Sequence, residues 1–280
     1  MAHRDTADAI GRIVKICFVA VLLVIALFPL AWLILTSFKG SSEILSVPPT
    51  VFPQAFTVEA YYDIWWKQPF AVYIFNTIKV TLCSTALSIF CAALAGYGFA
   101  NLKFPLKKLL LMIVLIAQMF PASSLIISIF EMYHSLGLYD THVGLILMYS
   151  TITLSFAIWM LYGYFKNIPV SLKEAAIIDG ATEFQVFSRV VLPLAKPGIA
   201  AVGVYSFMTG WNEYFYALIL TTTNNKLLAS VGLANFITEF GTKWNEMSAA
   251  SVIVVIPTLI IFMLLGKNLI AGLTAGAVKG

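Results

Sequence analysis

Five stretches without a charged residue most constrain the fold of this chain. They cover residues 16–38, 80–102, 109–130, 143–165 and 247–266, and they are 20 to 23 residues long. A helix rises ~1.5 Å per residue, so each stretch is long enough to cross the roughly 30 Å hydrocarbon core of a bilayer. A sixth window, 197–225, contains a single charge, Glu213. These windows predict an all-α membrane protein with six transmembrane helices in one domain, residues 1–280.

The composition fits the same class. Of the 280 residues, 60% are hydrophobic and 11% are charged, and the mean hydropathy is +0.92. A soluble domain of this length cannot bury so much apolar surface. The three cysteines lie within apolar windows and the three histidines are scattered along the chain, so neither a disulfide nor a metal site is expected.

Lysine and arginine residues predict the orientation in the membrane. Twelve of the seventeen lie in the two terminal segments and in the loops on the same side, and five lie on the other side. Because positively charged loops stay in the cytoplasm, both termini are expected there. The net charge of +4 reflects this bias, so no nucleic-acid partner is expected.

Residues 171–193 form a polar segment between two apolar windows, on the predicted cytoplasmic side. Two capping-box spacings, S-x-x-E at 171–174 and T-x-x-Q at 182–185, each predict the start of a helix. Gly180 between them suits a left-handed turn, and Pro193 is expected to end the second helix. The segment therefore predicts two short helices, set at an angle, that project from the membrane.

The two short helices are expected to present different faces. One side of the first helix carries mostly small residues, namely Leu172, Ala175, Ala176 and Asp179. One side of the second carries a bulky apolar ridge, formed by Phe184, Phe187 and Val191. A ridge beside a groove of small residues is typical of a docking surface. A hairpin that lies against the chain's own inner face fits these residues equally well.

A longer pattern in this segment resembles the EAA loop of ABC importer permeases. Glu174-Ala175-Ala176 is followed by three residues, Gly180, nine residues and Val190-x-Leu192-Pro193, and the departure from E-A-A-x3-G-x9-I-x-L-P is Val190. Three further stretches resemble the maltose-type carbohydrate permeases, in particular the shorter permease of the pair. They are LGLYDTHVGLIL at 136–147, WNEY at 211–214 and GLTAGAVKG at 272–280. The resemblance implies a type I importer fold of six helices with cytoplasmic EAA coupling helices.

The same resemblance implies a function. The chain is expected to be a permease subunit of an ATP-driven importer in the bacterial plasma (inner) membrane, taking up a sugar or oligosaccharide delivered by an extracellular solute-binding protein. A second permease, as heterodimer partner, and two ATPase subunits are implied, and the ATPases would bind ATP and Mg²⁺. The resemblance also implies that the chain is not an enzyme and needs no cofactor of its own. It has no G-x-x-x-x-G-K-[ST] loop to hold ATP.

A secondary transporter, or a permease for another small polar solute, is the alternative function. Secondary transport usually needs coupling groups at mid-membrane and an internal repeat. The chain has one acid within an apolar window and no visible repeat, which argues against that mechanism.

Roles within the EAA segment also follow from the resemblance. Glu174 is expected to meet a basic group of the ATPase, Ala175 and Ala176 to permit close approach, and Gly180 to set the angle between the helices. The residues expected to couple the permease to the ATPase are Glu174, Ala175, Ala176, Asp179, Gly180, Phe184, Phe187, Leu192 and Pro193.

Glu213 is the acid within the sixth window, and a carboxylate in hydrocarbon is costly unless it faces a cavity or a partner. In one interpretation Trp211, Asn212 and Glu213 line or brace the sugar path, where a ring and polar groups suit hydroxyls. In the other, the three belong to a structural network that fixes a bent helix near Gly210.

The remaining expectations concern segments outside the spans. The aromatic residues of the loop 39–71 suit either an interfacial belt or a contact surface, and the LGLYD turn is expected to pack on neighbouring helices. The segment 224–246 is expected to touch the solute-binding protein. The tail 272–280 is expected to be extended and to reach the ATPase dimer.

Overall fold

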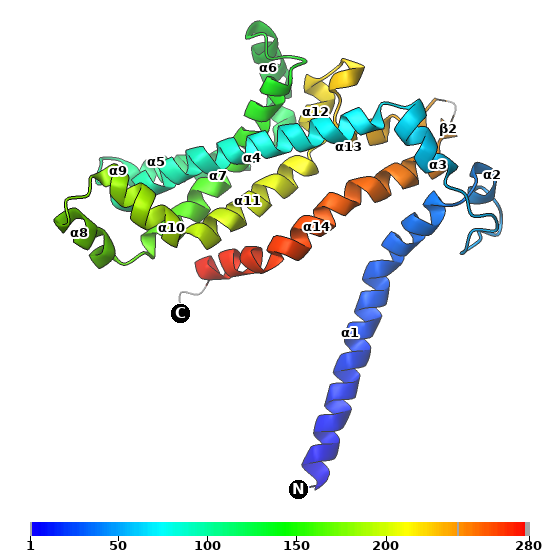
Figure 1. Cartoon of the computed structure of the whole chain (residues 1–280), viewed down its shortest axis with the longest axis horizontal. Helices are drawn as coiled ribbons and strands as arrows, with labels where there is room; N and C mark the ends of the chain where they lie inside the picture. The colour runs from blue at the N-terminus through cyan, green and yellow to red at the C-terminus, as the bar shows by residue number, and fades with distance from the viewer. Residues whose placement is uncertain (1, 240, 278–280) are drawn as a thin grey trace. The chain divides into compact units, whose positions relative to one another are not determined.

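The structure is a computed structural model that describes residues 2–239 and 241–277 (Figure 1). Its internal contacts group the chain into two compact units. The first comprises Met1–Phe70 and Leu233–Val255, and the second comprises Ala71–Gly232 and Ile256–Gly280. The single domain predicted over residues 1–280 stays a prediction.

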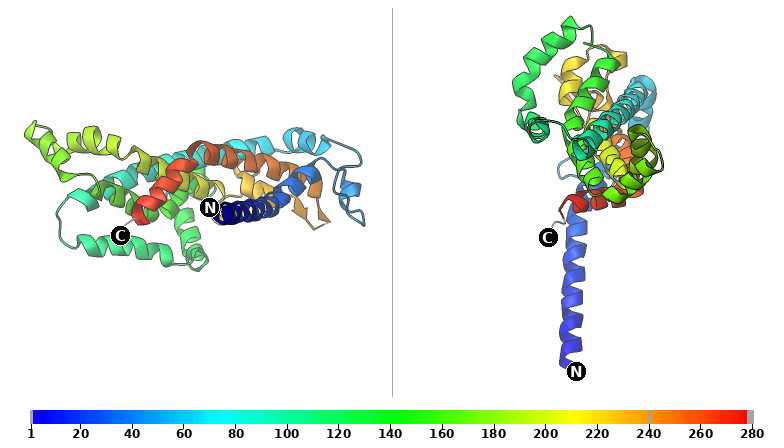
Figure 2. Two further views of the ribbon diagram at one scale, coloured as in Figure 1. Left: turned by 90° about the horizontal axis from the view of Figure 1, so that it is seen from below. Right: turned by 90° about the vertical axis from the view of Figure 1, so that its left-hand side faces the viewer.

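The first unit begins with the long helix α1, Ala2–Ser37, which Figure 2 shows as one continuous rod. Its span Gly11–Ser37 is apolar and almost wholly exposed, as expected for a helix whose solvent is lipid. The loop that follows contains three short helical turns, α2 Ser41–Ile44, α3 Glu59–Tyr62 and η1 Asp63–Lys67. A small antiparallel hairpin, β1 Ile237–Thr238 and β2 Gly241–Thr242, is the one sheet in the described residues. The last helix, α14, then begins at Trp244.

Three long helices make the core of the second unit: α4 Phe70–Asn101, α7 His142–Lys166 and α11 Lys196–Trp211. Small and hydroxylated residues line their contacts. Ser150 Oγ donates to the Ser84 carbonyl at 3.1 Å, and Thr153 Oγ1 donates to Ser88 Oγ at 2.9 Å. Lipid provides no hydrophobic force between helices, so close backbone approach and interhelical hydrogen bonds hold such helices together.

Four described helices are long and apolar enough to span a membrane, or six if each bent pair counts as one span. The predicted helix over 109–130 is interrupted. The chain forms α5 Lys107–Ile116, η2 Ala117–Met119 and α6 Ala122–Ser135, with a bend of 101° between the two arms. Pro121 explains the break because it lacks an N–H and disfavours the helical conformation of Phe120, which is extended.

The other spans also differ from their predicted bounds. The second helix begins ten residues earlier than expected, at Phe70. The predicted window 197–225 contains α11, an interruption, α12 Phe215–Leu220 and the turn η4 Asn224–Lys226, and α13 Ala229–Ala234 follows. Helix α14 continues to Ala277, so the expectation of an extended tail is wrong for residues 272–277, and 278–280 lie outside the described residues. Once a helix has formed, each further residue adds a hydrogen bond at little cost.

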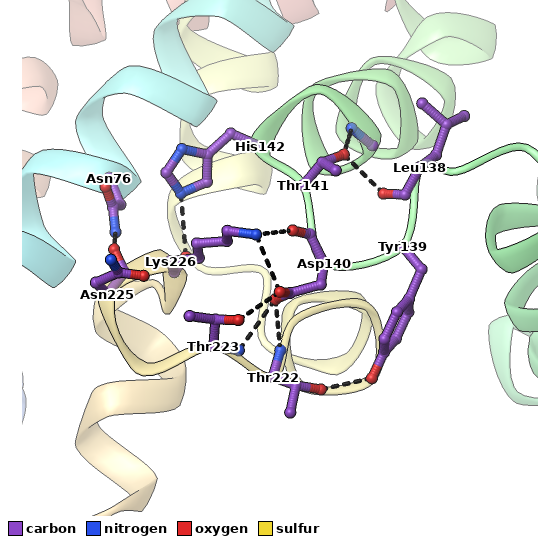
Figure 3. Close-up of polar contacts among 11 residues, drawn as sticks. Asn76, Leu138, Tyr139, Asp140, Thr141, His142, Thr222, Thr223, Asn225 and Lys226 are labelled. Atoms are coloured by element: carbon purple, nitrogen blue, oxygen red, sulfur yellow. Dashed lines mark hydrogen bonds and ion pairs between the residues drawn. The ribbon is translucent and has the colours of Figure 1, made fainter.

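The LGLYD turn packs on neighbouring elements as predicted, through a polar cluster around Asp140 (Figure 3). Asp140 has φ +53°, a left-handed conformation that aspartate tolerates better than most residues. Its carboxylate accepts hydrogen bonds from the backbone N–H groups of Thr222 and Thr223, at 2.9 and 3.0 Å, and from Lys226 Nζ at 3.0 Å. The imidazole of His142 contacts the Lys226 carbonyl at 3.1 Å. We call this set the Asp140 cluster; it ties the turn before α7 to the segment after α12.

Candidate functional site

The EAA segment folds as a helical hairpin at the end of the second unit where α4 finishes (Figure 1). It consists of α8 Val170–Ile178, α9 Glu183–Gln185, the π-helical turn η3 Val186–Val191 and α10 Leu192–Leu194. We call residues 170–194 the coupling segment.

One of the two predicted helix starts is confirmed. The side chain of Thr182 accepts a hydrogen bond from the Gln185 N–H, and the Gln185 side chain accepts one from the Thr182 N–H, which is a complete capping box. The predicted box at Ser171 and Glu174 is wrong, because α8 already begins at Val170 with Pro169 as its N-cap. Pro169 has an extended backbone, and no side chain caps this helix start.

Gly180 forms the predicted left-handed turn, with φ +85°. Its amide donates to the Ile177 carbonyl at 3.0 Å, and the Ala181 amide donates to the Ala176 carbonyl at 2.9 Å, which completes the C-terminal cap of α8. The second helix ends at Leu194, one residue after Pro193. The helical path continues through Leu194 and turns by 75° into α11.

The surface of the coupling segment contains most of the predicted coupling residues. Glu174, Ala175, Asp179, Gly180 and Pro193 are exposed, and Phe184 is 70% exposed. Ala176 and Leu192 are half-buried and pack against the core of the second unit.

The predicted ridge of Phe184, Phe187 and Val191 does not form one surface. Phe187 and Val191 are buried within this chain's own core, where Phe187 packs against Tyr97 with ring centroids 4.9 Å apart. The hairpin therefore combines both alternatives: one face lies on its own protein and the other is free to dock. The predicted contact of Phe187 with an ATPase is corrected to a contact with α4.

Two residues of the exposed face were missed by the sequence analysis. Ile178 is 85% exposed and Ile177 is 49% exposed, immediately before the turn at Gly180. With Phe184 they give the tip of the coupling segment an exposed apolar surface, which is typical of a protein contact. The sequence did contain a signal for this surface, because two adjacent isoleucines stand at the end of a helix that lies outside the membrane spans.

The second predicted group, Trp211, Asn212 and Glu213, lies at the end of α11 that is far from the coupling segment. Helix α11 has 16 residues and is therefore about 24 Å long. The Glu213 carboxylate accepts hydrogen bonds from the backbone N–H groups of Tyr216 and Ala217, at 3.0 and 3.2 Å, so it caps the start of α12. Its carbonyl accepts from Tyr149 Oη at 3.3 Å and Ser230 Oγ at 2.8 Å.

The three residues of that group therefore differ in what they can contact. Trp211 is buried and stacks on Phe207, with ring centroids 5.5 Å apart. Asn212 is exposed, although its side-chain amide donates to the Met208 carbonyl at 2.7 Å. These contacts favour the structural interpretation for Trp211 and Glu213 and leave Asn212 as the member accessible to a solute.

Comparison with known proteins identifies the family. Residues 84–274 match the family described as binding-protein-dependent transport system inner membrane component. The chain belongs to this family. The matched region contains the coupling segment, most of α4 and both of the interrupted spans, so this permease is a multi-pass membrane protein.

Curated relatives cover almost the whole length of the permease. It is 36% identical to the inner membrane ABC transporter permease protein YcjP of Escherichia coli (strain K12), over 97% of this chain and 98% of that protein. It is 34% identical to the sulfoquinovosyl glycerol transport system permease protein SmoH of Agrobacterium fabrum (strain C58), over 96% and 95%. It is 35% identical to the trehalose transport system permease protein SugB of Mycobacterium tuberculosis, over 91% and 93%.

A solved structure shows the same fold. A chain in the crystal structure of a bacterial ABC transporter involved in the import of the acidic polysaccharide alginate superposes with a TM-score of 0.82 and 24% identity. The match covers 93% of this permease and 97% of that chain. The predicted type I ABC importer permease fold is confirmed.

Proposed function

We propose that this permease forms half of the transmembrane pathway of an ATP-driven importer for a sugar or oligosaccharide. The observation that carries the proposal is the coupling segment, which keeps the EAA pattern and presents Glu174, Ile178 and Phe184 to solvent. The carbohydrate specificity is supported by relatives named for trehalose and for sulfoquinovosyl glycerol.

The proposed assembly contains this permease, a second permease as heterodimer partner, two ATPase subunits and an extracellular solute-binding protein. ATP and Mg²⁺ belong to the ATPase subunits. Lysine and arginine residues are concentrated on the side of the coupling segment, which supports cytoplasmic termini and a cytoplasmic docking surface. The Asp140 cluster then lies on the extracellular side, toward the binding protein.

In this proposal the exposed face of the coupling segment seats in the ATPase, and its buried face rests on α4 and α7. Movement of the ATPase subunits on binding and hydrolysing ATP would shift the segment and so alternate the access of the pathway. Gly180 sets the angle between α8 and α9, because its positive φ is strained for any residue with a side chain.

The test uses Glu174→Lys and Gly180→Val in the assembled transporter. Each should leave the permease in the membrane and should uncouple sugar uptake from ATP hydrolysis. The matched control is Glu131→Lys, the same charge reversal at an exposed position of α6, which should transport normally. Normal uptake and normal ATPase stimulation in both coupling variants would overturn the docking role. Uptake that does not depend on ATP would favour the secondary transporter.

A further inference from the structure

The buried face of the coupling segment is fastened to one side of α4 by two polar contacts. Tyr97 Oη donates to Glu183 Oε2 at 3.0 Å, which reaches α9. Lys173 Nζ donates to Asn101 Oδ1 and to the Phe165 carbonyl, the latter at 3.5 Å, which fastens α8. Tyr97 and Asn101 are four residues apart and therefore share one face of the last turns of α4.

Aromatic packing surrounds the contact with α9. The rings of Tyr97, Phe165 and Phe187 contact one another with centroid distances of 4.9, 6.2 and 6.5 Å. All three residues are buried, at 8%, 0% and 7% exposure. The phenol of this contact is buried and its carboxylate partner Glu183 is exposed, so the hydrogen bond lies at the edge of the aromatic cluster.

One contact holds α8 and the other holds α9, so α4 is bonded to both helices of the hairpin, on either side of Gly180. A rigid displacement of the segment must then be passed to α4, and so must a change in the angle between the arms. Helix α4 is a core helix of the second unit, and it makes hydrogen bonds to α7 at Ser84 and Ser88. The last turns of α4 are thus the place where movement of the docking surface enters the transmembrane core.

We propose that Tyr97 and Asn101 are positioning residues that transmit movement of the coupling segment to α4, so that removing either contact lowers the sugar imported per ATP hydrolysed without releasing the ATPase. This inference rests on the proposed function, because it requires an ATPase subunit docked on the exposed face of the coupling segment.

The experiment measures three quantities on the complete transporter in proteoliposomes: ATPase subunits bound per permease, stimulated ATP hydrolysis and sugar uptake. Tyr97→Phe removes only the hydroxyl, and Asn101→Leu removes the acceptor for Lys173 while keeping a similar volume. Each should bind a full complement of ATPase and should lower uptake per ATP by about three- to tenfold, the range expected for one hydrogen bond between coupled elements.

Matched variants separate transmission from a general structural defect. Tyr164 lies in α7, and its hydroxyl makes no hydrogen bond among the described residues. The Tyr164→Phe variant should therefore couple normally. Glu183→Gln keeps an oxygen that accepts from Tyr97 and should largely keep coupling, whereas Glu183→Ala should lower it. Tyr97→Phe combined with Glu183→Ala should be no worse than the more affected single variant, because both remove the same bond.

Two results would overturn the inference: wild-type uptake per ATP in both Tyr97→Phe and Asn101→Leu, or loss of bound ATPase in proportion to the loss of uptake. Glu174→Lys, measured in parallel, keeps the two proposals distinguishable. If Glu174→Lys uncouples the transporter and the α4 variants do not, the transmission role fails and docking stands. If Glu174→Lys has no effect either, docking itself fails.

Discussion

Asp140→Asn should destabilise the permease by removing the charge at the centre of the Asp140 cluster. One carboxylate oxygen, Oδ1, accepts from the backbone N–H groups of Thr222 and Thr223, and the other, Oδ2, accepts from Thr223 Oγ1 and Lys226 Nζ. An amide oxygen at the Oδ1 position keeps both backbone bonds. An amide nitrogen at the Oδ2 position cannot accept from Lys226, although the Thr223 hydroxyl can rotate to accept from it.

The expected loss is therefore one charge-assisted hydrogen bond. Such a bond contributes about 1.5–3 kcal/mol, but the Lys226 side chain is 40% exposed and also donates to the Asp140 carbonyl at 2.6 Å. Solvent screening lowers the expected cost to about 1–2 kcal/mol. For a chain of this size that cost corresponds to roughly 3–6 °C in the unfolding temperature.

The assay is thermal unfolding of the purified permease in detergent, for Asp140→Asn, Lys226→Gln and the double variant. The double variant should be less destabilised than the sum of the single variants, since both remove the same pair. Lys67→Gln is the comparison: it breaks a pair with Asp63 in which the lysine side chain is 59% exposed, and it should lower the unfolding temperature less than Asp140→Asn does. An unchanged unfolding temperature for Asp140→Asn, or full additivity, would refute this reasoning.

The same cluster predicts a pH dependence. Burial opposes ionisation of Asp140, but the donors Thr222, Thr223 and Lys226 outweigh burial and hold the pKa of its carboxyl well below the usual range. A lowered folded-state pKa gives stability that is present above the unfolded pKa of about 4 and is lost as the pH falls below it. The difference in unfolding temperature between wild type and Asp140→Asn should be largest at pH 7 and should shrink below about pH 4.

Three further substitutions test other contacts. Gly144→Ala should destabilise the permease by about 1–3 kcal/mol, because an added Cβ would lie 2.3 Å from the Leu138 carbonyl oxygen, whereas Gly163→Ala in the same helix has open space and should be neutral in thermal unfolding. Ile237 is 62% exposed in the segment predicted to touch the binding protein, so Ile237→Cys should crosslink to that protein. Phe236→Cys should not, because the Phe236 side chain is buried against Phe70. The predicted contact would be removed if no crosslink formed anywhere in residues 235–243. If Asn212 faces the solute, Asn212→Ala should weaken uptake by less than tenfold without changing stability. Uptake equal to that of the wild type at limiting sugar would leave Asn212 without a role in the pathway.

The fold was predictable to the extent that it follows from hydrophobic length and local signals. The turn at Gly180 and the capping box at Thr182 were predicted correctly, because each depends on residues close together in the chain. The bend before α6 was missed although Pro121 is visible in the sequence, since a charge-free window records length and not continuity.

The faces of the coupling segment could not be predicted in the same way. The prediction that Phe184, Phe187 and Val191 form a ridge assumed α-helical spacing. Residues 186–191 form a π-helical turn instead, which changes the residues that share a face. The contacts of Tyr97 with Glu183 and of Asn101 with Lys173 join residues 86 and 72 positions apart, and no local pattern indicates such pairs. The sequence draws attention to Glu213, but its capping of α12 depends on an interruption that only the structure shows.

The central claim is that the tip of the coupling segment docks on an ATPase subunit, and crosslinking from Ile178 tests it most directly. Ile178→Cys places a thiol at a position that is 85% exposed, and Phe187→Cys places one at a buried position of the same segment. Membranes carrying the assembled transporter would be treated with a short bifunctional thiol–amine reagent. We predict an adduct between the permease and the ATPase for Ile178→Cys and none for Phe187→Cys. An assembled transporter in which Ile178→Cys reacts freely with a soluble thiol reagent but forms no adduct with the ATPase would contradict docking at this surface.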